Sequence, residues 1–336
     1  MKNFTRTIYS QLLARIGTLN GVDNVTATFS VAPTIQQKLE TAIQESSAFL
    51  KSINVIGVAE MEGEKLRLGV SGPVAGRTNT TNADRQTRDL SGLKDQKYKC
   101  YKTDFDTHIP YAKLDAWAKF PDFQSRVANV IVQQQALDRI MIGFNGISAA
   151  ATTNIVTNPL LQDVNIGWLQ QMRNEAPENV MDSGATPNKI KIGATGDYKN
   201  LDAAVFDAIT LLDPWFREDS NLVAIVGREL MHDKYFPLVN KDQAATETLA
   251  SDIIISQKRL GGLQAVTVPF MPSNAILITR MDNLSIYFQE EARRRSLIDN
   301  PKRDRVENYE SSNDAYVVED FGMAALIENI EFVEAP

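Results

Sequence analysis

The sequence is poor in the residues that most enzymes use for chemistry, and it lacks the long apolar runs that cross membranes. Its 336 residues include one cysteine, Cys100, so no internal disulfide can form and a reducing compartment is the natural environment. His108 and His232 are the only imidazole bases, and neither lies in a catalytic motif. No apolar run approaches the roughly 20 residues of a transmembrane helix. We therefore expect a soluble globular protein, large enough for two domains, with no membrane segment.

Motifs that bind nucleotides or activate a serine are also missing. Gly69, Gly72 and Gly76 do not have dinucleotide-binding spacing, and no phosphate loop ending in Gly-Lys-Ser/Thr occurs. The segment GVSGP at 69–73 nearly matches a nucleophile elbow, but Pro73 stands where the motif needs glycine, so a turn is the better interpretation. The sequence predicts no cofactor, no bound metal and no catalytic residues.

The N-terminus has no acidic residue before Asp23. Five apolar residues recur at helical spacing within it, which predicts an amphipathic helix that docks on a surface. Arg15 would interrupt the apolar core of a secretory signal, although an organelle transit peptide would look similar. The five residues are Phe4, Ile8, Leu12, Ile16 and Leu19.

Basic residues are absent after Arg305, so the chain's acidity is almost wholly C-terminal. Residues 306–336 contain eight acidic residues, while the run Arg293, Arg294, Arg295 lies just before them. One interpretation is charge complementarity between neighbouring copies of the chain, and the other is a solvated strand face. Nucleic-acid recognition is disfavoured, because the chain offers one short basic cluster diluted by acids instead of a basic face.

No Val, Ile, Leu, Met or Phe occurs between Ala75 and Asp89, so this stretch cannot bury itself. On its N-terminal side the sequence alternates from Lys65 to Val70, and alternation returns from Lys99 to Tyr111. The two arms predict a long hairpin with an exposed tip. A short helix at 112–119 and a long one at 122–142, ended by Gly143 and Gly146, should follow. With the mixed helix and strand signals of the remaining chain, the fold class is α+β.

Asp104, Asp106 and His108 share one face of the predicted strand. Carboxylate and imidazole groups suit a divalent cation, which raises the alternative of a metal-dependent hydrolase. Neighbours on one strand face lie about 7 Å apart, however, too far for all three to converge on one ion. A solvated strand face is the favoured interpretation.

Blocks of sequence along nearly the whole chain carry a family resemblance. The blocks are ESSAFLKSINVI (45–56), GEKLRLGVSGPVAGRT (63–78), LDAWAKFPDFQ (114–124), ALDRIMIGFNG (136–146), NPLLQDVNIGWLQQMRNEAP (158–177), LVAIVGREL (222–230), KYFPLVN (234–240), SDIIISQKR (251–259), NLSIYF (283–288) and NPKRDRVENYESSNDAYVVED (300–320). In these blocks the chain resembles the major capsid proteins of peduovirus-type tailed bacteriophages.

This resemblance implies the Johnson fold of tailed-phage and herpesvirus major capsid proteins, which divides into four parts. Residues 1–50 would be the N-terminal arm and 51–108 the extended loop. Residues 109–155 and 280–336 would form the peripheral domain with its spine helix, and 156–279 the axial domain.

The function that the resemblance implies is structural, not enzymatic. Such chains self-assemble as hexamers and pentamers into an icosahedral procapsid and then a mature head that encloses double-stranded DNA, without sequence-specific binding. The implied partners are an internal scaffolding protein, a maturation protease and a portal. The protein would be found in the virion after assembly in the bacterial host cytoplasm. An encapsulin-like shell protein is the alternative within the same fold.

Two sets of residues follow as site predictions. The protease is expected to cut near Phe29, Ser30, Val31 and Ala32, which would remove the N-terminal helix. The subunit interface is expected to include the charged side chains of the tip and of the C-terminal region, namely Arg77, Arg85, Arg88, Arg293, Arg294, Arg295, Glu307 and Glu310.

Overall fold

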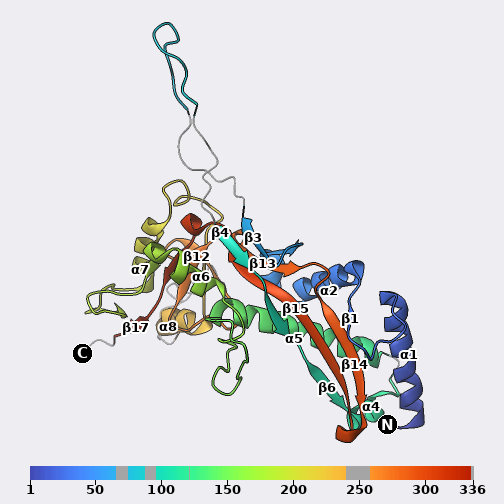
Figure 1. Ribbon diagram of the computed structural model, residues 1–336. Helices are drawn as coiled ribbons and strands as arrows, with labels where there is room; N and C mark the ends of the chain where they lie inside the picture. The colour runs from blue at the N-terminus through green and yellow to red at the C-terminus, as the bar shows by residue number, and fades with distance from the viewer. Residues whose placement is uncertain (66–74, 88–95, 121, 240–257, 334–336) are drawn as a thin grey trace.

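A computed structural model describes residues 1–65, 75–87, 96–120, 122–239 and 258–333 (Figure 1). The helices are α1 (Asn3–Asn20), α2 (Pro33–Glu45), α3 (Ala48–Ser52), α4 (Tyr111–Trp117), α5 (Phe123–Asn145), α6 (Trp168–Glu175), α7 (Leu201–Ala208) and α8 (Arg228–Val239). The strands are β1 (Phe29–Ser30), β2 (Asn54–Val58), β3 (Glu62–Lys65), β4 (Gln96–Lys99), β5 (Tyr101–Asp104), β6 (Thr107–Pro110), β7 (Val180–Met181), β8 (Ile190–Ile192), β9 (Val223–Val226), β10 (Arg259–Leu260), β11 (Leu263–Thr267), β12 (Ile276–Thr279), β13 (Leu284–Gln289), β14 (Arg294–Asn300), β15 (Arg305–Val318), β16 (Ala325–Ile327) and β17 (Ile330–Phe332).

The larger sheet is built around β15, which runs for 14 residues. Its main path is β1-β14-β15-β13-β2, and β5 and β6 also pair with β15. The predicted alternation of 101–110 is confirmed, because Thr103 and Phe105 are buried while Lys102, Asp104 and His108 are exposed. Of β15 itself, only residues 316–318 have the apolar run that predicts a strand. Strand β15 is therefore the element that joins the end of the hairpin arm to the C-terminal part of the chain.

The smaller sheet has the order β10-β11-β9-β12-β16-β7 and is covered on both faces. Ile225, Leu277 and Leu326 face a core shared with α5 and the larger sheet. Their neighbours along the strands point to the other face, where they pack with α7 and α8. Strand β16 belongs to this sheet, so the C-terminal segment leaves the larger sheet and returns to the part of the molecule formed by 156–279.

Trp168 is the centre of the shared core and is fully buried. Its ring makes edge contacts with Phe49, Phe144 and Tyr316 at centroid distances of 5.9, 5.2 and 5.4 Å, and its indole N–H donates to the carbonyl of Ser285 at 3.0 Å. A Cβ at Gly143 would lie 2.2 Å from this ring. Gly143 therefore does not end α5, as the sequence predicted, but lets Trp168 approach it. The helix continues to Asn145 and ends before Gly146.

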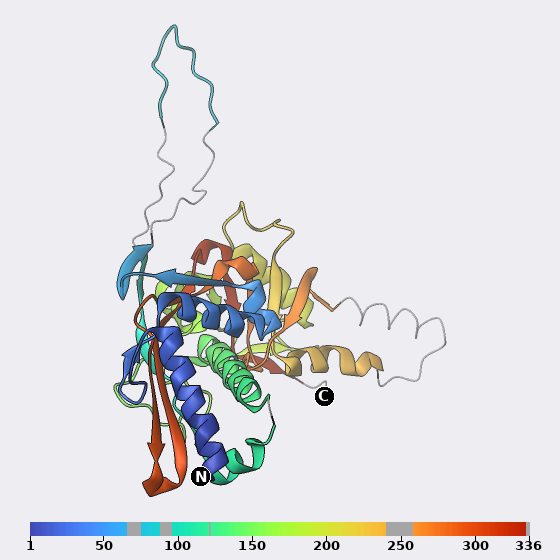
Figure 2. The same ribbon diagram turned by 90° about the vertical axis from the view of Figure 1, so that its right-hand side faces the viewer.

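The described part of the hairpin projects from the body. Strands β3 and β4 form its base as an antiparallel pair, with Glu62 opposite Lys99. Residues 75–87 lie far beyond this base and are exposed throughout (Figures 1 and 2). The predicted strand at 65–70 lies, apart from Lys65, outside the described residues. The exposed tip that the sequence predicts is confirmed for the described residues.

Candidate functional site

The predicted cleavage region is part of the larger sheet. Phe29 and Ser30 form β1, an edge strand paired antiparallel with Arg295 and Arg294 of β14, and the backbone N–H of Val31 donates to the carbonyl of Arg293 at 2.9 Å. Phe29 and Val31 are buried. The backbone groups of residues 29–31, to which a protease would have to hydrogen-bond, are therefore already paired within the chain.

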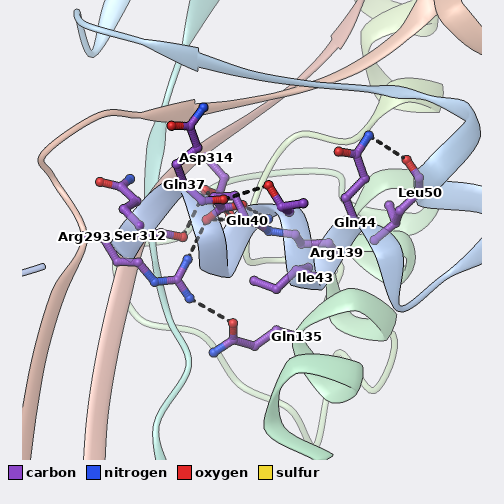
Figure 3. A network of polar contacts seen from close by, with 12 residues as sticks. Gln37, Glu40, Ile43, Gln44, Leu50, Gln135, Arg139, Arg293, Ser312 and Asp314 are labelled. Carbon is purple, nitrogen blue, oxygen red and sulfur yellow. Dashed lines mark hydrogen bonds and ion pairs between the residues drawn. The ribbon is translucent and has the colours of Figure 1, made fainter. Parts of the chain in front are cut away.

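Immediately after this region, the chain is anchored by a cluster of charged side chains in the interior (Figure 3). Arg293 donates to Glu40 at 2.6 Å, to Glu310 at 2.6 and 2.8 Å and to Gln135 at 2.8 Å. Arg139 of α5 donates to the same Glu40 and, at 3.2 Å, to both carboxylate oxygens of Asp314. The cluster joins α2, α5, β15 and the segment before β14. Its members are Glu40, Gln135, Arg139, Arg293, Glu310, Ser312 and Asp314, all at most 4% exposed.

Three carboxylates face two guanidinium groups in this cluster, so their pKa values diverge. Burial raises the pKa of Glu40, but Arg139 and Arg293 outweigh that effect and hold the pKa below its ordinary value. The pKa of Glu310 is likewise low, because Arg293 and Arg295 outweigh its burial. At Asp314 burial prevails over Arg139, and the pKa is raised. Asp314 therefore holds a proton most readily of the three.

These directions predict how stability depends on pH. Glu40 and Glu310 have lowered pKa values, so their contribution is present above their unfolded pKa of about 4.5 and is lost as the pH falls below it. Asp314, with a raised pKa, acts in the opposite sense. We expect the urea midpoint of the unassembled subunit to fall steeply below about pH 4.5 and Glu310→Gln to flatten that fall. If the urea midpoint of Glu310→Gln fell as steeply as that of the wild type, the lowered pKa of Glu310 would not be a cause of the pH dependence.

The predicted interface residues separate into exposed and interior ones. Arg77 and Arg85 are exposed on the tip, Arg294 is exposed on β14, and Arg88 lies outside the described residues. Arg293 and Glu310 are buried and paired with each other, so neither charge is available on the subunit surface. Arg295 and Glu307 are also hydrogen-bonded within the chain. Arg295 donates to the side-chain oxygen of Asn308 at 2.8 Å, and Glu307 accepts from Arg305 at 2.6 Å and from Tyr309 at 2.7 Å.

The opposite charges that lie side by side in the sequence thus meet across the β14–β15 hairpin of one chain. Arg295 stands opposite Glu310, and Arg294 opposite Ser311. Neither of the two sequence-based interpretations anticipated this arrangement. Glu40 and Arg139 were not among the candidate residues. No helix was predicted around Glu40, and a charged residue on an amphipathic helix, such as Arg139 in 122–142, is ordinarily exposed. The remaining signal was that both lie three helix positions from buried apolar residues, Ile43 for Glu40 and Ala136 and Ile142 for Arg139.

The candidate metal ligands do not come together. Asp104 and His108 are exposed on β5 and β6, and the carboxylate of Asp106 accepts the backbone N–H of Glu310 at 3.2 Å. Among the residues that the structure describes, no group of three or more His, Cys, Asp or Glu side chains is placed to hold a metal ion. Cys100 is buried, and burial raises the pKa of its thiol to about 12, which keeps it in the unreactive thiol form.

Within the described ranges, no helix has the combination of length and apolar character needed to cross a bilayer. The surface features that bear on contacts with other proteins are the projecting tip, the paired cleavage region and two apolar hollows beside α4 and α5. Exposed apolar surface of this kind is typical of sites of protein–protein contact.

Comparisons with known proteins agree with this arrangement. Residues 8–330 match the family model "Phage major capsid protein, P2 family". The chain is 49% identical to the "Capsid proteins" of Escherichia phage P2, over 98% of this chain and 96% of that protein. It is 42% identical to the "Major capsid protein" of Serratia phage KSP20, over 99% of both.

Solved structures give the same result. The chain superposes with a TM-score of 0.83 on a protein from the satellite phage P4 procapsid that includes the size determination (Sid) protein, with 46% identity over 99% of both chains. It also superposes on the capsid of a native GTA particle with a TM-score of 0.51 and 16% identity, over 85% of this chain and 91% of that one, which shows the shared fold. The fold is the Johnson fold that the resemblance implied. The chain belongs to the P2 family of phage major capsid proteins.

Proposed function

We propose that this major capsid protein assembles as hexamers and pentamers into an icosahedral procapsid, which matures into a head around double-stranded DNA. The observation that carries this proposal is the tip at 75–87, which is exposed in every residue and contains no large apolar side chain with which to fold back on its own subunit. A segment held away from the body gains contacts only from a neighbour. In this proposal the tip lies over the adjacent subunit, and each pair of subunits buries an interface of ordinary size, about 1,200–2,000 Å².

The four predicted parts take roles within that shell. Residues 1–50 act as the arm, 51–108 as the extended loop, 109–155 with 280–336 as the peripheral domain and 156–279 as the axial domain. The return of β16 to the smaller sheet supports a refinement, in which the last strands of the chain serve the axial domain. We further propose that the protein performs no catalysis and takes no cofactor. Its proposed partners are an internal scaffolding protein, a maturation protease, a portal and the packaged DNA.

The direct test is negative-stain microscopy of the chain expressed alone, and then together with the scaffolding protein and protease of the same phage genome. Closed shells that become more uniform with the scaffolding protein are the expected result. A discrete monomer under every condition would overturn the proposal. Purified shells that contain DNA would separate a genome container from a cargo-carrying, encapsulin-like shell.

Reversing the tip charges is expected to impair assembly without unfolding the subunit. In Arg77→Glu/Arg85→Glu, two exposed cations become anions on a segment that makes its contacts with a neighbour, and like charges across an interface are repulsive. We expect the yield of closed shells to fall at least about tenfold. The measurement is sedimentation of shells from lysate, with the melting temperature of the unassembled subunit as a check on folding.

Arg228→Glu/Arg303→Glu serves as the matched control, since it reverses the same number of exposed arginines outside the tip. It should leave the shell yield near that of the wild type. Equal loss in both variants would show that the yield responds to net charge in general, and the tip would then have no special role.

We propose that the maturation protease cuts within Phe29, Ser30, Val31 and Ala32, and that this cut requires β1 to detach from β14 first. Proteases generally bind their substrates as extended strands through backbone hydrogen bonds. Here the backbone groups of β1 are already paired with β14. An edge strand of 2 residues is short enough to open locally without unfolding the sheet.

A disulfide across this pair is expected to block the cut. Ser30 and Arg294 stand opposite each other and are both exposed, so Ser30→Cys/Arg294→Cys should form the bond under oxidation, whereas native Cys100 is buried. With the disulfide formed, we expect at least about a tenfold slower cut, because opening of the strand is prevented. Mass spectrometry of the products measures this. Each single cysteine variant, and the reduced double variant, should be cut at the wild-type rate.

A further inference from the structure

Helix α1 docks on its own subunit along the β14–β15 hairpin (Figures 1 and 2). The middle of the predicted stripe makes this contact, since Ile16 is buried and Leu12 packs beside it in an apolar cluster. Phe4 and Leu19, at the two ends of the stripe, are 64% and 52% exposed, whereas Thr5, outside the stripe, is buried. The body contributes Leu297 of β14 to the same cluster. The contact is thus made by one face of the helix and an apolar surface of the body.

The N-terminal end of α1 has a specific polar contact. The backbone N–H of Lys2 donates to the carboxylate of Asp115 on α4 at 2.9 Å. A hydrogen bond from the Thr5 hydroxyl, followed by the one from Lys2, lowers the pKa of Asp115. A carboxylate at this position satisfies otherwise unpaired amide groups and interacts favourably with the helix dipole. Asp115 therefore recognises the helix terminus and fixes the direction in which α1 lies.

The packing between α1 and the body is incomplete. A hollow of about 370 Å³ separates the Tyr9 to Leu19 face from Ile109, Leu114 and Val127. The hydroxyl of Tyr9 is buried there without a hydrogen-bond partner. An interface with unfilled space and an unsatisfied donor is weaker than the densely paired cluster that holds α2. Helix α1 is thus attached to the body less firmly than α2 is.

Segment 1–31 nevertheless has contacts that do not depend on its covalent link to Ala32. These contacts are the Asp115 cap, the apolar cluster around Ile16, the β1–β14 pair and the backbone bond from Leu297 to the carbonyl of Val25 at 3.0 Å. We propose that the surface beneath α1 is a helix-binding groove whose ligand is this chain's own N-terminal segment, so that cutting and release are separate steps. This inference rests on the proposed cleavage only for the stage of maturation at which the segment is released.

Release of α1 exposes apolar surface, whereas the cut alone does not. A second apolar hollow of about 560 Å³ adjoins the groove and is lined by Trp117, Phe120 and Val130. The two hollows share Ile109, Val127 and Ile131. Departure of α1 joins them into one apolar surface, whereas a cut with α1 still bound leaves the groove covered.

The test uses the full chain with a recognition site for an unrelated protease inserted between Ala27 and Thr28, both exposed. After the cut, segment 1–27 is expected to elute with the body in gel filtration, and a dye that binds apolar surfaces should gain fluorescence only when dilution releases the segment. Separation of the segment from a folded wild-type body immediately after the cut, at micromolar concentration, would overturn the proposal.

Two variants make the result specific. Ile16→Asp places a charge in the apolar cluster and should weaken retention about tenfold or more. Ala14→Asp, on the exposed side of α1, should retain the segment as the wild type does. Equal retention in both variants would place the contact outside the groove and overturn the proposal. Because an unrelated protease makes the cut at the inserted site, this outcome does not depend on whether the phage protease cuts at 29–32, which mass spectrometry of the natural products decides separately.

Discussion

Replacing Arg293 with methionine is expected to lower the free energy of unfolding of the subunit by about 3–5 kcal/mol. Arg293 is fully buried and is hydrogen-bonded to Glu40, Gln135 and Glu310. Methionine fills much of the same volume but removes the charge. The carboxylates of Glu40 and Glu310 would then lie in the interior with only Arg139 and Arg295 nearby, and burying a poorly compensated charge is far more costly than losing a surface ion pair.

Arg294→Met is the matched control, because it makes the same substitution at the next residue, where the side chain is exposed. Its effect should stay within about 0.5 kcal/mol. Urea unfolding of the unassembled subunit measures both. Asp314→Asn should lower the free energy of unfolding less than Arg293→Met does. The raised pKa of Asp314 indicates that, of the three carboxylates in the cluster, it is the one whose ionised form is least favoured. Similar midpoints for Arg293→Met and Arg294→Met would show that the cluster contributes little to stability.

Replacing Trp168 with alanine is expected to destabilise the subunit by a similar amount, about 3–5 kcal/mol. Trp168 is fully buried, and its ring fills the space between Phe49, Phe144 and Tyr316, against the bare backbone of Gly143. Alanine would leave a cavity, and the carbonyl of Ser285 would lose its donor. The cavity lies where α5, α6 and the larger sheet meet, so all three elements lose packing at once.

Trp215→Ala provides the comparison. Trp215 is 43% exposed and contacts Phe216, so its removal leaves no enclosed cavity and should cost less than about 1 kcal/mol. Chemical denaturation followed by circular dichroism avoids the change in tryptophan fluorescence that both substitutions cause. A loss for Trp168→Ala no larger than that for Trp215→Ala would mean that the core repacks around the missing ring.

Regular patterns in the sequence predicted the elements whose burial alternates or repeats. The alternating burial of 101–110 was predicted correctly from the period of two in its sequence, although the structure divides the segment into β5 and β6 at Phe105 and Asp106. Helix α5 was predicted to within a few residues, and its end was misplaced because Gly143 resembles a helix stop while its actual role is to admit the Trp168 ring. The local sequence pattern therefore predicted the secondary structure. It could not predict that the Trp168 ring, from a distant part of the sequence, packs against Gly143.

Strand β15 shows why the rest could not be predicted. Glu307, Asn308, Glu310 and Asp314 are buried in it, so its first ten residues lack the apolar alternation of an ordinary strand. Their partners are far away in sequence: Arg139 lies 175 residues from Asp314, and Arg293 lies 253 residues from Glu40. Such pairing leaves no periodic signal. The same property kept Glu40, Arg139 and Asp314 off the list of candidate residues and made Arg293 and Glu310 look like surface charges.

Strand β15 also has a mechanical consequence. At 14 residues it extends for about 46 Å, and over Arg305–Ser311 it is hydrogen-bonded to β14 on one edge and to β5 and β6 on the other. In antiparallel pairs these bonds lie perpendicular to the strand. A tensile load along β15 therefore places two rows of bonds in shear at once, and they must yield together instead of opening one after another. Within each subunit, this strand is suited to bear tension along the wall of the capsid.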